Sequence, residues 1–459
     1  MQKAIPVDQE QPQKLLPYRP MPQSIEDTKI PDIFLANLTL KHCFYLEAFK
    51  LTDLEERLKL SVPIIMDLLD YLVRQKYVEI LGSDPYRQLL TTTDLTLRYA
   101  LTGEGKKRAD QILNYDAYIG PAPVTLNDYW EQATSQSIQI TNVSPERLQA
   151  VLQGLVIPPE LLNKLGPAII SGKPLFLYGP PGNGKTTIAL RLGEMWEDVI
   201  LIPYALYIDG QIIRVFDEMV HRPVAAPATE PELIDRRWVR TSRPAVIVGG
   251  ELTMDMLDLS FSPTLKYYEA PLQLKANNGL LIVDDFGRQS IHPHELLNRW
   301  IIPMENHQDL LRLHTGQKFT IPFDVFMVFA TNLEPTSLID DAFLRRIRSK
   351  VKLTPVTREQ FIEIFRLVCQ QYQIEFNPEA VNYLLNNYYA DQQRRMDACH
   401  PRDLVEHILD HSRFYQIPPS LSQESLIKFR PAFLKKAWIA PAGLILYTKF
   451  EYYSDPQKF

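Results

Sequence analysis

The chain has 459 residues, of which 45% are apolar and 23% are charged, and its formal net charge is −6. This composition is typical of a globular protein of about three domains, and its charge excludes a general attraction to nucleic acid or to anionic membranes. Its three cysteines (Cys43, Cys369 and Cys399) are far apart, which excludes a disulfide framework and a CxxC metal site. No apolar stretch has the length of a membrane span and no signal-peptide core begins the chain. We therefore expect a cytoplasmic protein without membrane contact.

The first part of the chain changes character near residue 30. Residues 1–30 are rich in proline and glutamine and have little apolar periodicity, so we predict a disordered arm there. Residues 31–115 have the periodicity of a compact module. The predicted elements of that module are helices over 33–48, 51–58 and 61–76, strands over 77–81 and 97–101, and a helix that begins at Thr102.

Helices followed by a hairpin that ends in Tyr-Ala-Leu-Thr-x-x-Gly, at residues 99–105, resemble a winged-helix domain. Residues 33–113 contain eleven Lys or Arg and eleven Asp or Glu, and the helix that would meet DNA carries Asp67 and Asp70. Surfaces that bind duplex DNA are normally basic. We favour a role in protein contact for this module, with DNA binding as the alternative.

Residues 116–145 are predicted to be a linker. Residues 118–124 contain Pro121 and Pro123, which favour an extended and stiff segment. After the linker we place a nucleotide-binding domain over residues 146–354, which begins with helical patterns that include residues 160–171.

A glycine-rich motif follows the apolar residues 174–178 and precedes a helical pattern. A strand, a GxxxxGK[ST] turn and a helix form a phosphate-binding loop, in which Lys185 reaches the β- and γ-phosphates and the Thr186 hydroxyl binds Mg²⁺. The sequence therefore predicts a site for ATP and Mg²⁺. Its residues are Gly179, Pro180, Pro181, Gly182, Asn183, Gly184, Lys185, Thr186 and Thr187.

Two further apolar strands are followed by polar residues. Residues 279–283 lead into Asp284 and Asp285, the pattern of a Walker B motif. Asp284 is expected beside Mg²⁺, through the ion's water shell, and Asp285 is expected to orient or deprotonate the attacking water. Residues 325–330 lead into Thr331 and Asn332, and Arg345 and Arg346 follow a short acidic pair.

This order of motifs resembles the AAA+ ATPase superfamily, an α/β P-loop fold with a parallel sheet. The resemblance implies a homo-oligomeric ring, a hexamer, that hydrolyses ATP between subunits. It implies that Asn332 places the attacking water and that Arg345 or Arg346 reaches the nucleotide of the neighbouring subunit. It also implies that Val156 and Ile157 contact the adenine.

Helical patterns over 357–371, 378–389 and 401–413 resemble the small helical lid of the same superfamily, which we place at residues 355–417. Within the lid, Arg402 matches the position that contacts the γ-phosphate. Residues 418–459 are a C-terminal extension whose role the sequence does not indicate.

One residue departs from the AAA+ pattern. Most active members have glutamate where this chain has Asp285, and the shorter side chain would place its carboxylate about 1.5 Å farther from a water positioned for glutamate. Either the water is shifted, or turnover is slow and the protein acts as an ATP switch.

The stretch before the acidic strand is unusually long. It resembles AAA+ branches with an insertion at this place, such as MoxR-type chaperones, magnesium chelatase and enhancer-binding activators. A loop with Gly249, Gly250, Met254, Met256 and Leu257 would suit the central pore of a ring, and a core helix over 252–259 is the alternative. We expect an oligomeric ATPase that remodels an unidentified protein client. The alternatives are a DNA-associated regulator and a non-hydrolysing switch.

Overall fold

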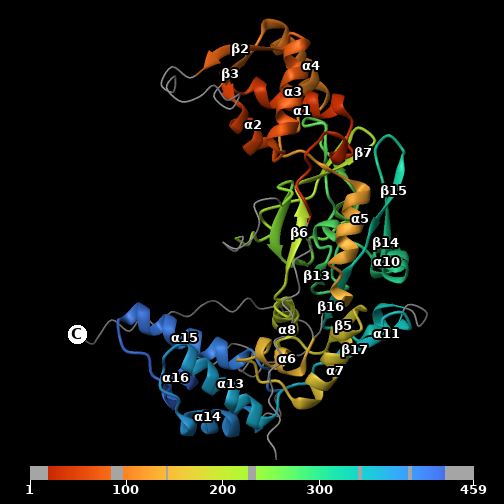
Figure 1. The fold of residues 1–459 in the computed structure, drawn as a ribbon. Helices are drawn as coiled ribbons and strands as arrows, with labels where there is room; N and C mark the ends of the chain where they lie inside the picture. Colours follow the sequence, from red (N-terminus) through yellow and green to blue (C-terminus); the bar gives the residue numbers. More distant parts are fainter. Residues whose placement is uncertain are drawn as a thin grey trace, which may run out of the picture. The chain divides into compact units, whose positions relative to one another are not determined.

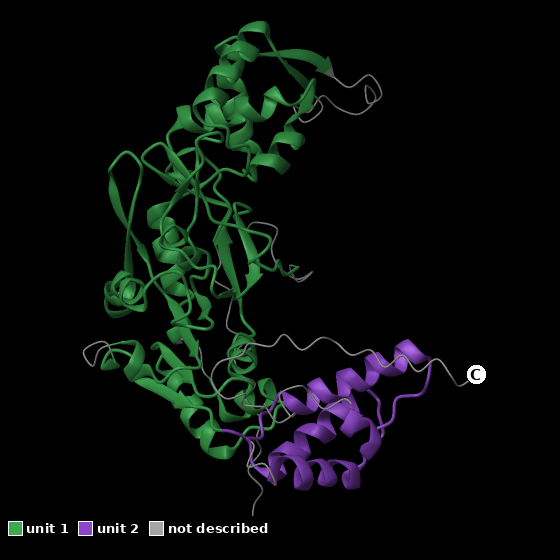
Figure 2. Cartoon of the chain, turned by 180° about the vertical axis from the view of Figure 1, so that it is seen from behind, with its two compact units in different colours: residues 1–354 green, residues 355–459 purple. Residues whose placement is uncertain are grey.

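The computed structural model describes residues 19–83, 97–140, 143–225, 234–339, 344–390 and 395–428. The chain divides into two compact units, residues 1–354 and 355–459 (Figure 2). The boundary between the two units lies at residue 355, where the helical lid is predicted to begin. Across the described ranges, every helix is too short or too polar to cross a membrane.

The N-terminal module, residues 31–115, is a helical cluster with a small antiparallel sheet in the order β1-β3-β2 (Figure 1). Helix α3 buries Ile64, Leu68 and Leu72 at helical spacing. The Thr102 hydroxyl accepts a hydrogen bond from the Gly105 amide and so caps α4. The elements are α1 (Asp32–Phe44), β1 (Phe49–Lys50), α2 (Leu51–Leu58), α3 (Val62–Arg74), β2 (Val78–Ser83), β3 (Leu97–Leu101) and α4 (Gly103–Tyr115).

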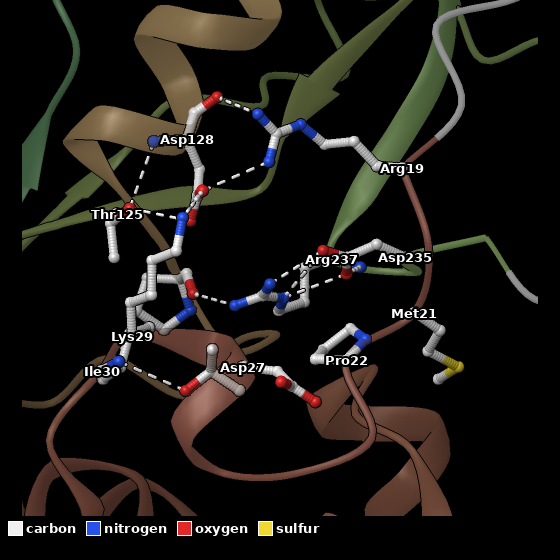
Figure 3. A network of polar contacts seen from close by, with 12 residues as sticks. Arg19, Met21, Pro22, Asp27, Lys29, Ile30, Thr125, Asp128, Asp235 and Arg237 are labelled. Atoms are coloured by element: carbon white, nitrogen blue, oxygen red, sulfur yellow. Dashed lines mark hydrogen bonds and ion pairs between the residues drawn. The ribbon is translucent and has the colours of Figure 1, made fainter.

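The expectation of a disordered arm over residues 1–30 is wrong for residues 19–30, which we call the N-terminal strap (Figure 3). The Arg19 guanidinium lies 3.3 Å from the carboxylate of Asp128, and the Arg19 carbonyl accepts a 2.9 Å bond from the Asp235 amide. Lys29 lies 2.9 Å from the same Asp128 carboxylate. The strap also contains η1 (Glu26–Thr28). Composition could not reveal these contacts, because the partners lie far along the chain. Residues 1–18 lie outside the described residues.

The prediction of a linker over residues 116–145 is also wrong, because residues 116–140 are part of the packed fold. Val124 is fully buried, and Tyr118 is buried with its hydroxyl donating to the Pro121 carbonyl at 2.9 Å. The prolines thus shape a packed segment instead of a free spacer. Its elements are β4 (Val124–Thr125), α5 (Leu126–Ser135) and η3 (Ile138–Ile140).

The central sheet of the first unit has the strand order β10-β13-β16-β5-β17, and every neighbouring pair is parallel. Leu175 and Leu177 pack with α6, α7 and α8 on one face, and Phe176 packs with α10 on the other. Parallel strands bring their carboxyl ends to one edge, which is where sites form in such sheets. The strands are β5 (Leu175–Tyr178), β10 (Ala245–Val248), β13 (Gly279–Val283), β16 (Val325–Thr331) and β17 (Ser349–Lys352). The helices are α6 (Pro145–Val151), α7 (Pro159–Ile170), α8 (Lys185–Leu192), α10 (Pro293–Asn306) and α11 (Pro335–Leu338).

A second five-stranded sheet, in the order β11-β12-β8-β7-β4, forms from the long stretch between β5 and β13 together with β4. The hairpin β14–β15, which the sequence analysis did not predict, packs beside α5, where Trp130 donates to the Thr320 carbonyl at 3.1 Å (Figure 1). In β14 the charged Asp309 is buried and Leu310 is exposed, so the strand lacks the alternation of apolar and polar residues that would have predicted it. The remaining elements here are β6 (Val199–Pro203), β7 (Ala205–Ile208), β8 (Gln211–Arg214), β9 (Trp238–Ser242), β11 (Ser260–Phe261), β12 (Tyr268–Glu269), α9 (Leu272–Lys275), β14 (Gln308–Arg312) and β15 (Lys318–Pro322).

The segment considered for the central pore is packed against the core. It forms the short helix η4 (Met254–Leu257), and both Leu252 and Leu257 are fully buried. Met254 and Met256 are half-buried against the same core. Core packing therefore accounts for the apolar residues of this segment, and Leu257 is not available as a pore contact.

The second unit is helical and extends beyond the predicted lid boundary at residue 417. Leu421 and Leu426 are buried in the same core as Phe361, Phe365 and Leu404, so the unit continues at least through α16. The extension past residue 428 lies outside the described residues. The elements are α13 (Arg358–Gln371), α14 (Pro378–Leu384), the π-helical η5 (Leu385–Ala390), α15 (His400–Tyr415) and α16 (Gln423–Lys428).

Candidate functional site

The glycine-rich loop connects the end of β5 to the start of α8, as its sequence predicts. Gly179, Gly182 and Gly184 have φ angles of +136°, +77° and +81°, which L side chains rarely adopt. A Cβ atom at Gly179 would lie 2.2 Å from the carbonyl oxygen of Leu353, the residue after β17, so this close approach also requires glycine. A curled backbone at a helix N-terminus presents amide groups to an anion.

Lys185 lies at the start of α8 and is 8% exposed. Its ammonium donates to the carbonyl oxygens of Gly179 at 3.0 Å and Pro180 at 2.9 Å. The Asn183 amide donates to the carbonyls of Pro180 and Pro181, at 3.3 and 3.2 Å, and stabilises the turn. The loop therefore holds a positive charge against its own backbone.

Thr186 and Asp284, which come from different elements, are in direct contact. The Thr186 hydroxyl donates to the two Asp284 carboxylate oxygens, at 2.9 and 3.1 Å. Mg²⁺ prefers oxygen ligands and is commonly held by one or two carboxylates together with substrate phosphates. The donor set of these two residues fits a magnesium ion.

Asp285 and Asn332 are also brought together, at the ends of β13 and β16. The Asn332 side-chain amide donates to a carboxylate oxygen of Asp285 at 3.0 Å. Asp285 has a φ of +47°, in the left-handed region. Aspartate and asparagine adopt this region more readily than most other residues. This preference gives a physical reason for aspartate at this position.

The turn after Asp285 is fastened to the neighbouring strand. The Phe286 amide donates to the Ala330 carbonyl, and the Thr331 hydroxyl donates to the Phe286 carbonyl, both at 2.8 Å. Gln289, which the sequence analysis missed, bonds within the same turn. No sequence motif identifies such a residue, because its partners are backbone groups.

Val156 and Ile157 lie in the connection between α6 and α7, and both are half-buried. Ile157 packs against the core cluster that also contains Ile188 of α8. Ile157 is therefore on the face of the sheet that carries the phosphate-binding helix. The contact of both residues with adenine stays a prediction.

Arg345 and Arg346 lie away from the carboxyl edge of the sheet. Both are exposed, and they line a cavity of about 340 Å³ beside Pro174 and Val325, near the amino ends of β5 and β16. Arg346 forms an ion pair with Glu305 of α10. Within the part of the chain that the structure describes, Arg345 makes no hydrogen bond or ion pair. The two arginines are thus separated from their own subunit's phosphate loop.

Arg402 belongs to the second unit, where it is the third residue of α15 and is exposed. The N-terminal part of this helix also contains His400, whose Nδ1 and the Tyr389 hydroxyl are joined by a 2.8 Å hydrogen bond. The contact of Arg402 with a γ-phosphate stays a prediction.

Comparisons with known proteins match parts of the chain. Residues 357–438 match the model of a family described as a domain of unknown function, DUF8689. A stretch of 40 residues is 50% identical to the vesicular-fusion protein SEC18 of Saccharomyces cerevisiae, over 9% of this chain and 5% of that protein.

Solved structures show a distant likeness. NtrX from Brucella abortus is 15% identical with a TM-score of 0.37, covering 61% of this chain and 56% of that chain. Domain III of the Thermotoga maritima replication initiation protein DnaA is 15% identical with a TM-score of 0.36, covering 64% of this chain and all of that domain (100%). The chain spans little more than half of NtrX and a twentieth of SEC18, so the activities of those proteins do not transfer to it.

The evidence for the fold class is the order of the strands and the residues that follow them. A phosphate loop follows β5, an acidic pair follows β13, and the strand between them, β16, ends at a polar residue. A helical unit follows this parallel sheet. The first unit therefore contains an α/β core in which a parallel sheet carries a phosphate-binding loop.

Proposed function

We propose that this protein is an oligomeric AAA+ ATPase that binds and hydrolyses ATP and remodels a protein partner. One observation supports the proposal above all others. Thr186, Asp284, Asp285 and Asn332, from three separate elements, form two hydrogen-bonded pairs beside the phosphate loop. These are the groups that ATP hydrolysis needs for metal binding and for placement of water.

The residues have distinct roles in this proposal. The loop amides and Lys185 bind the phosphates, and Thr186 and Asp284 would hold Mg²⁺, Asp284 through the ion's water shell. The bound ion would supply charge neutralisation on the phosphate oxygens. Asp285 orients the attacking water and accepts its proton, and Asn332 holds the Asp285 carboxylate in place through the observed 3.0 Å bond.

The bond between Asn332 and Asp285 favours turnover over a purely switching role. A shorter carboxylate can still act if it is held in a fixed position, and the Asp285 carboxylate is held by the Asn332 side chain. The non-hydrolysing switch remains the alternative, and it is the outcome if ATP binds without being consumed.

A second subunit completes the proposed site. Because Arg345 and Arg346 lie far from their own phosphate loop, they would act on a neighbour's nucleotide in a ring, proposed to be a hexamer. Arg346 is already paired with Glu305, so Arg345 is the better candidate for stabilising phosphoryl charge. Arg402 of the second unit would contact the γ-phosphate.

The N-terminal module is proposed to dock the protein client. Asp67 and Asp70 are exposed on α3, the helix that would face DNA in a winged-helix domain. Two carboxylates on this face would repel phosphates. The observation favours a protein partner over the DNA-associated alternative.

The Lys185→Ala variant tests the proposal. We expect ATP affinity to fall by about tenfold to a hundredfold, because a charge-assisted bond to phosphate is worth about 1.5–3 kcal/mol. ATP turnover, measured by phosphate release with Mg²⁺ present, should disappear at ATP concentrations that saturate the wild type. Lys173→Ala, a lysine just before β5, is the matched control and should keep the wild-type affinity.

Unchanged ATP affinity in Lys185→Ala would contradict the assignment of the site. Duplex binding that weakens steeply with salt would instead support the DNA-associated alternative. Turnover by wild-type protein that is equally present in the Lys185→Ala preparation would point to a contaminating ATPase.

A further inference from the structure

Gln289 lies in the turn that follows the two carboxylates, four residues after Asp285. Its side-chain oxygen accepts a bond from the Gly287 amide at 2.8 Å, and its side-chain nitrogen donates to the Asp284 carbonyl, also at 2.8 Å. Only one orientation of the carboxamide satisfies both partners, since one is a donor and the other an acceptor. Gln289 therefore joins the start of the turn to its middle.

The bond to the Asp284 carbonyl restrains the backbone of Asp285 directly. That carbonyl belongs to the peptide group whose nitrogen is the Asp285 amide, and this amide donates to the Asp284 carboxylate at 3.0 Å. Both ends of the peptide plane are thus held. The orientation of this plane sets the φ angle of Asp285, which is +47°.

The second bond restrains the other side of the turn. The Arg288 amide donates to the Asp285 carbonyl at 3.0 Å, which closes a four-residue turn with Gly287 at its third position. Gly287 has a φ of +99°, and a Cβ atom there would lie 2.5 Å from a methyl carbon of Leu338. Glycine adopts this φ without strain, so both the turn and the close approach of Leu338 require glycine at this position.

We infer that Gln289 is a positioning residue for ATP hydrolysis: its carboxamide holds Asp285 in the left-handed conformation that brings the Asp285 carboxylate to Asn332. The inference rests on the proposed function of the site. Gln289 acts through the backbone of Asp284 and Gly287, so the turnover step depends on it while phosphate binding by Lys185 does not.

The Gln289→Ala variant should keep the ATP affinity of the wild type and lose about tenfold to a hundredfold in kcat, because a misplacement of about 1 Å can cost a factor of a hundred. Gln289→Glu has nearly the same shape but cannot donate to the Asp284 carbonyl, so it should also be slow. Ser290→Ala is the control from the same turn, since the Ser290 hydroxyl bonds only outward, to the Leu252 carbonyl at 3.4 Å. Its kcat should match the wild type.

A double-mutant cycle separates positioning from general damage. If Gln289 acts through Asp285, then Gln289→Ala should cause no further loss of turnover in an Asp285→Asn background. Additive losses, or full turnover in Gln289→Ala alone, would overturn the inference while leaving the proposed function intact.

Amide hydrogen exchange gives a test that needs no turnover. Using full-length protein without nucleotide, the Gly287 amide should exchange faster in Gln289→Ala than in the wild type or in Ser290→Ala. Equal exchange in all three proteins would show that the Gln289 side chain does not restrain this turn. If the wild type shows no turnover but the variant exchanges faster, the proposed hydrolysis is rejected and the restraint of the turn by Gln289 is still supported.

Discussion

At the scale of single residues, backbone conformation decides what a short side chain can do. Asp285 is one methylene shorter than the usual glutamate, but it occupies a left-handed position and meets Asn332 at 3.0 Å. Glutamate has no local side-chain bond that favours this conformation, whereas aspartate does. The departure from the AAA+ pattern is therefore consistent with the local geometry of the turn.

Burial has a different consequence at His42 of α1. The ring is 2% exposed, and Nε2 bonds to the Gly120 carbonyl at 2.9 Å. Burial, aided by the nearby charges of Arg57 and Lys41, lowers the pKa of His42 from 6.5 to about 4, while the Gly120 bond opposes the shift. The folded protein therefore keeps this ring neutral in mildly acidic solution.

This shift predicts that the first unit loses stability as pH falls from 6.5 toward 4. In that window the unfolded chain binds a proton at His42 and the folded chain does not, so acid favours unfolding. The full effect is about 3 kcal/mol, at about 1.4 kcal/mol per pKa unit. Urea unfolding at several pH values measures it, and the His42→Gln variant should show a flatter pH dependence. Equal slopes for variant and wild type would show that His42 does not titrate in this way.

At the scale of elements, charged contacts hold the N-terminal strap to the first unit. The Arg19 guanidinium contacts Asp128, Glu131 and Gln132 and lies 5.1 Å from the centre of the Trp238 ring. The Asp128 side chain is only 7% exposed and is shared with Lys29. Partly buried pairs of this kind depend on each member, because a carboxylate left without a partner in a buried position is costly.

We expect Arg19→Ala to lower the free energy of unfolding by about 1–3 kcal/mol. Proteolysis within the strap should also become faster, since the segment would be released. The matched control is Lys107→Ala, which breaks an exposed pair with Glu104 on α4 and should cost less than about 0.5 kcal/mol. Urea unfolding of both variants provides the comparison, and equal losses would show that the strap contributes no more than a surface ion pair.

At the scale of the whole molecule, the residues proposed for one reaction lie at opposite edges of the central sheet. Asp284 and Lys185 are at the carboxyl edge, and Arg345 is beside the amino ends of β5 and β16. No single copy can bring these edges together, because the sheet separates them. A head-to-tail assembly can do so, and it closes into a ring when the rotation permits.

This arrangement predicts complementation between two inactive variants. Arg345→Ala copies keep an intact phosphate loop, and Lys185→Ala copies keep the arginine. Mixed assemblies should recover part of the wild-type ATP turnover, while each variant alone stays below about a hundredth of it. Mixing Arg345→Ala with Arg345→Ala/Lys185→Ala is the control and should recover nothing. A mixture no more active than its components would argue against an arginine supplied by a neighbouring copy.

The sequence by itself determined the features that consist of neighbouring residues. The phosphate loop between β5 and α8, the acidic end of β13 and the helical pattern of α3 each depend on a few adjacent positions, so local chemistry was enough to predict them. The pairing of Asp285 with Asn332 joins two strands that are distant in sequence, but it was accessible because parallel strands bring their carboxyl ends to one edge.

Only the tertiary structure decided the features that depend on distant partners. The strap needs Asp128, the packed segment after α4 needs the second sheet, and the hairpin β14–β15 needs α5. Gln289 belongs to this group because it bonds to backbone groups, which every sequence contains. Such contacts form when folding brings separate segments together, and a local pattern of residue types contains no record of them.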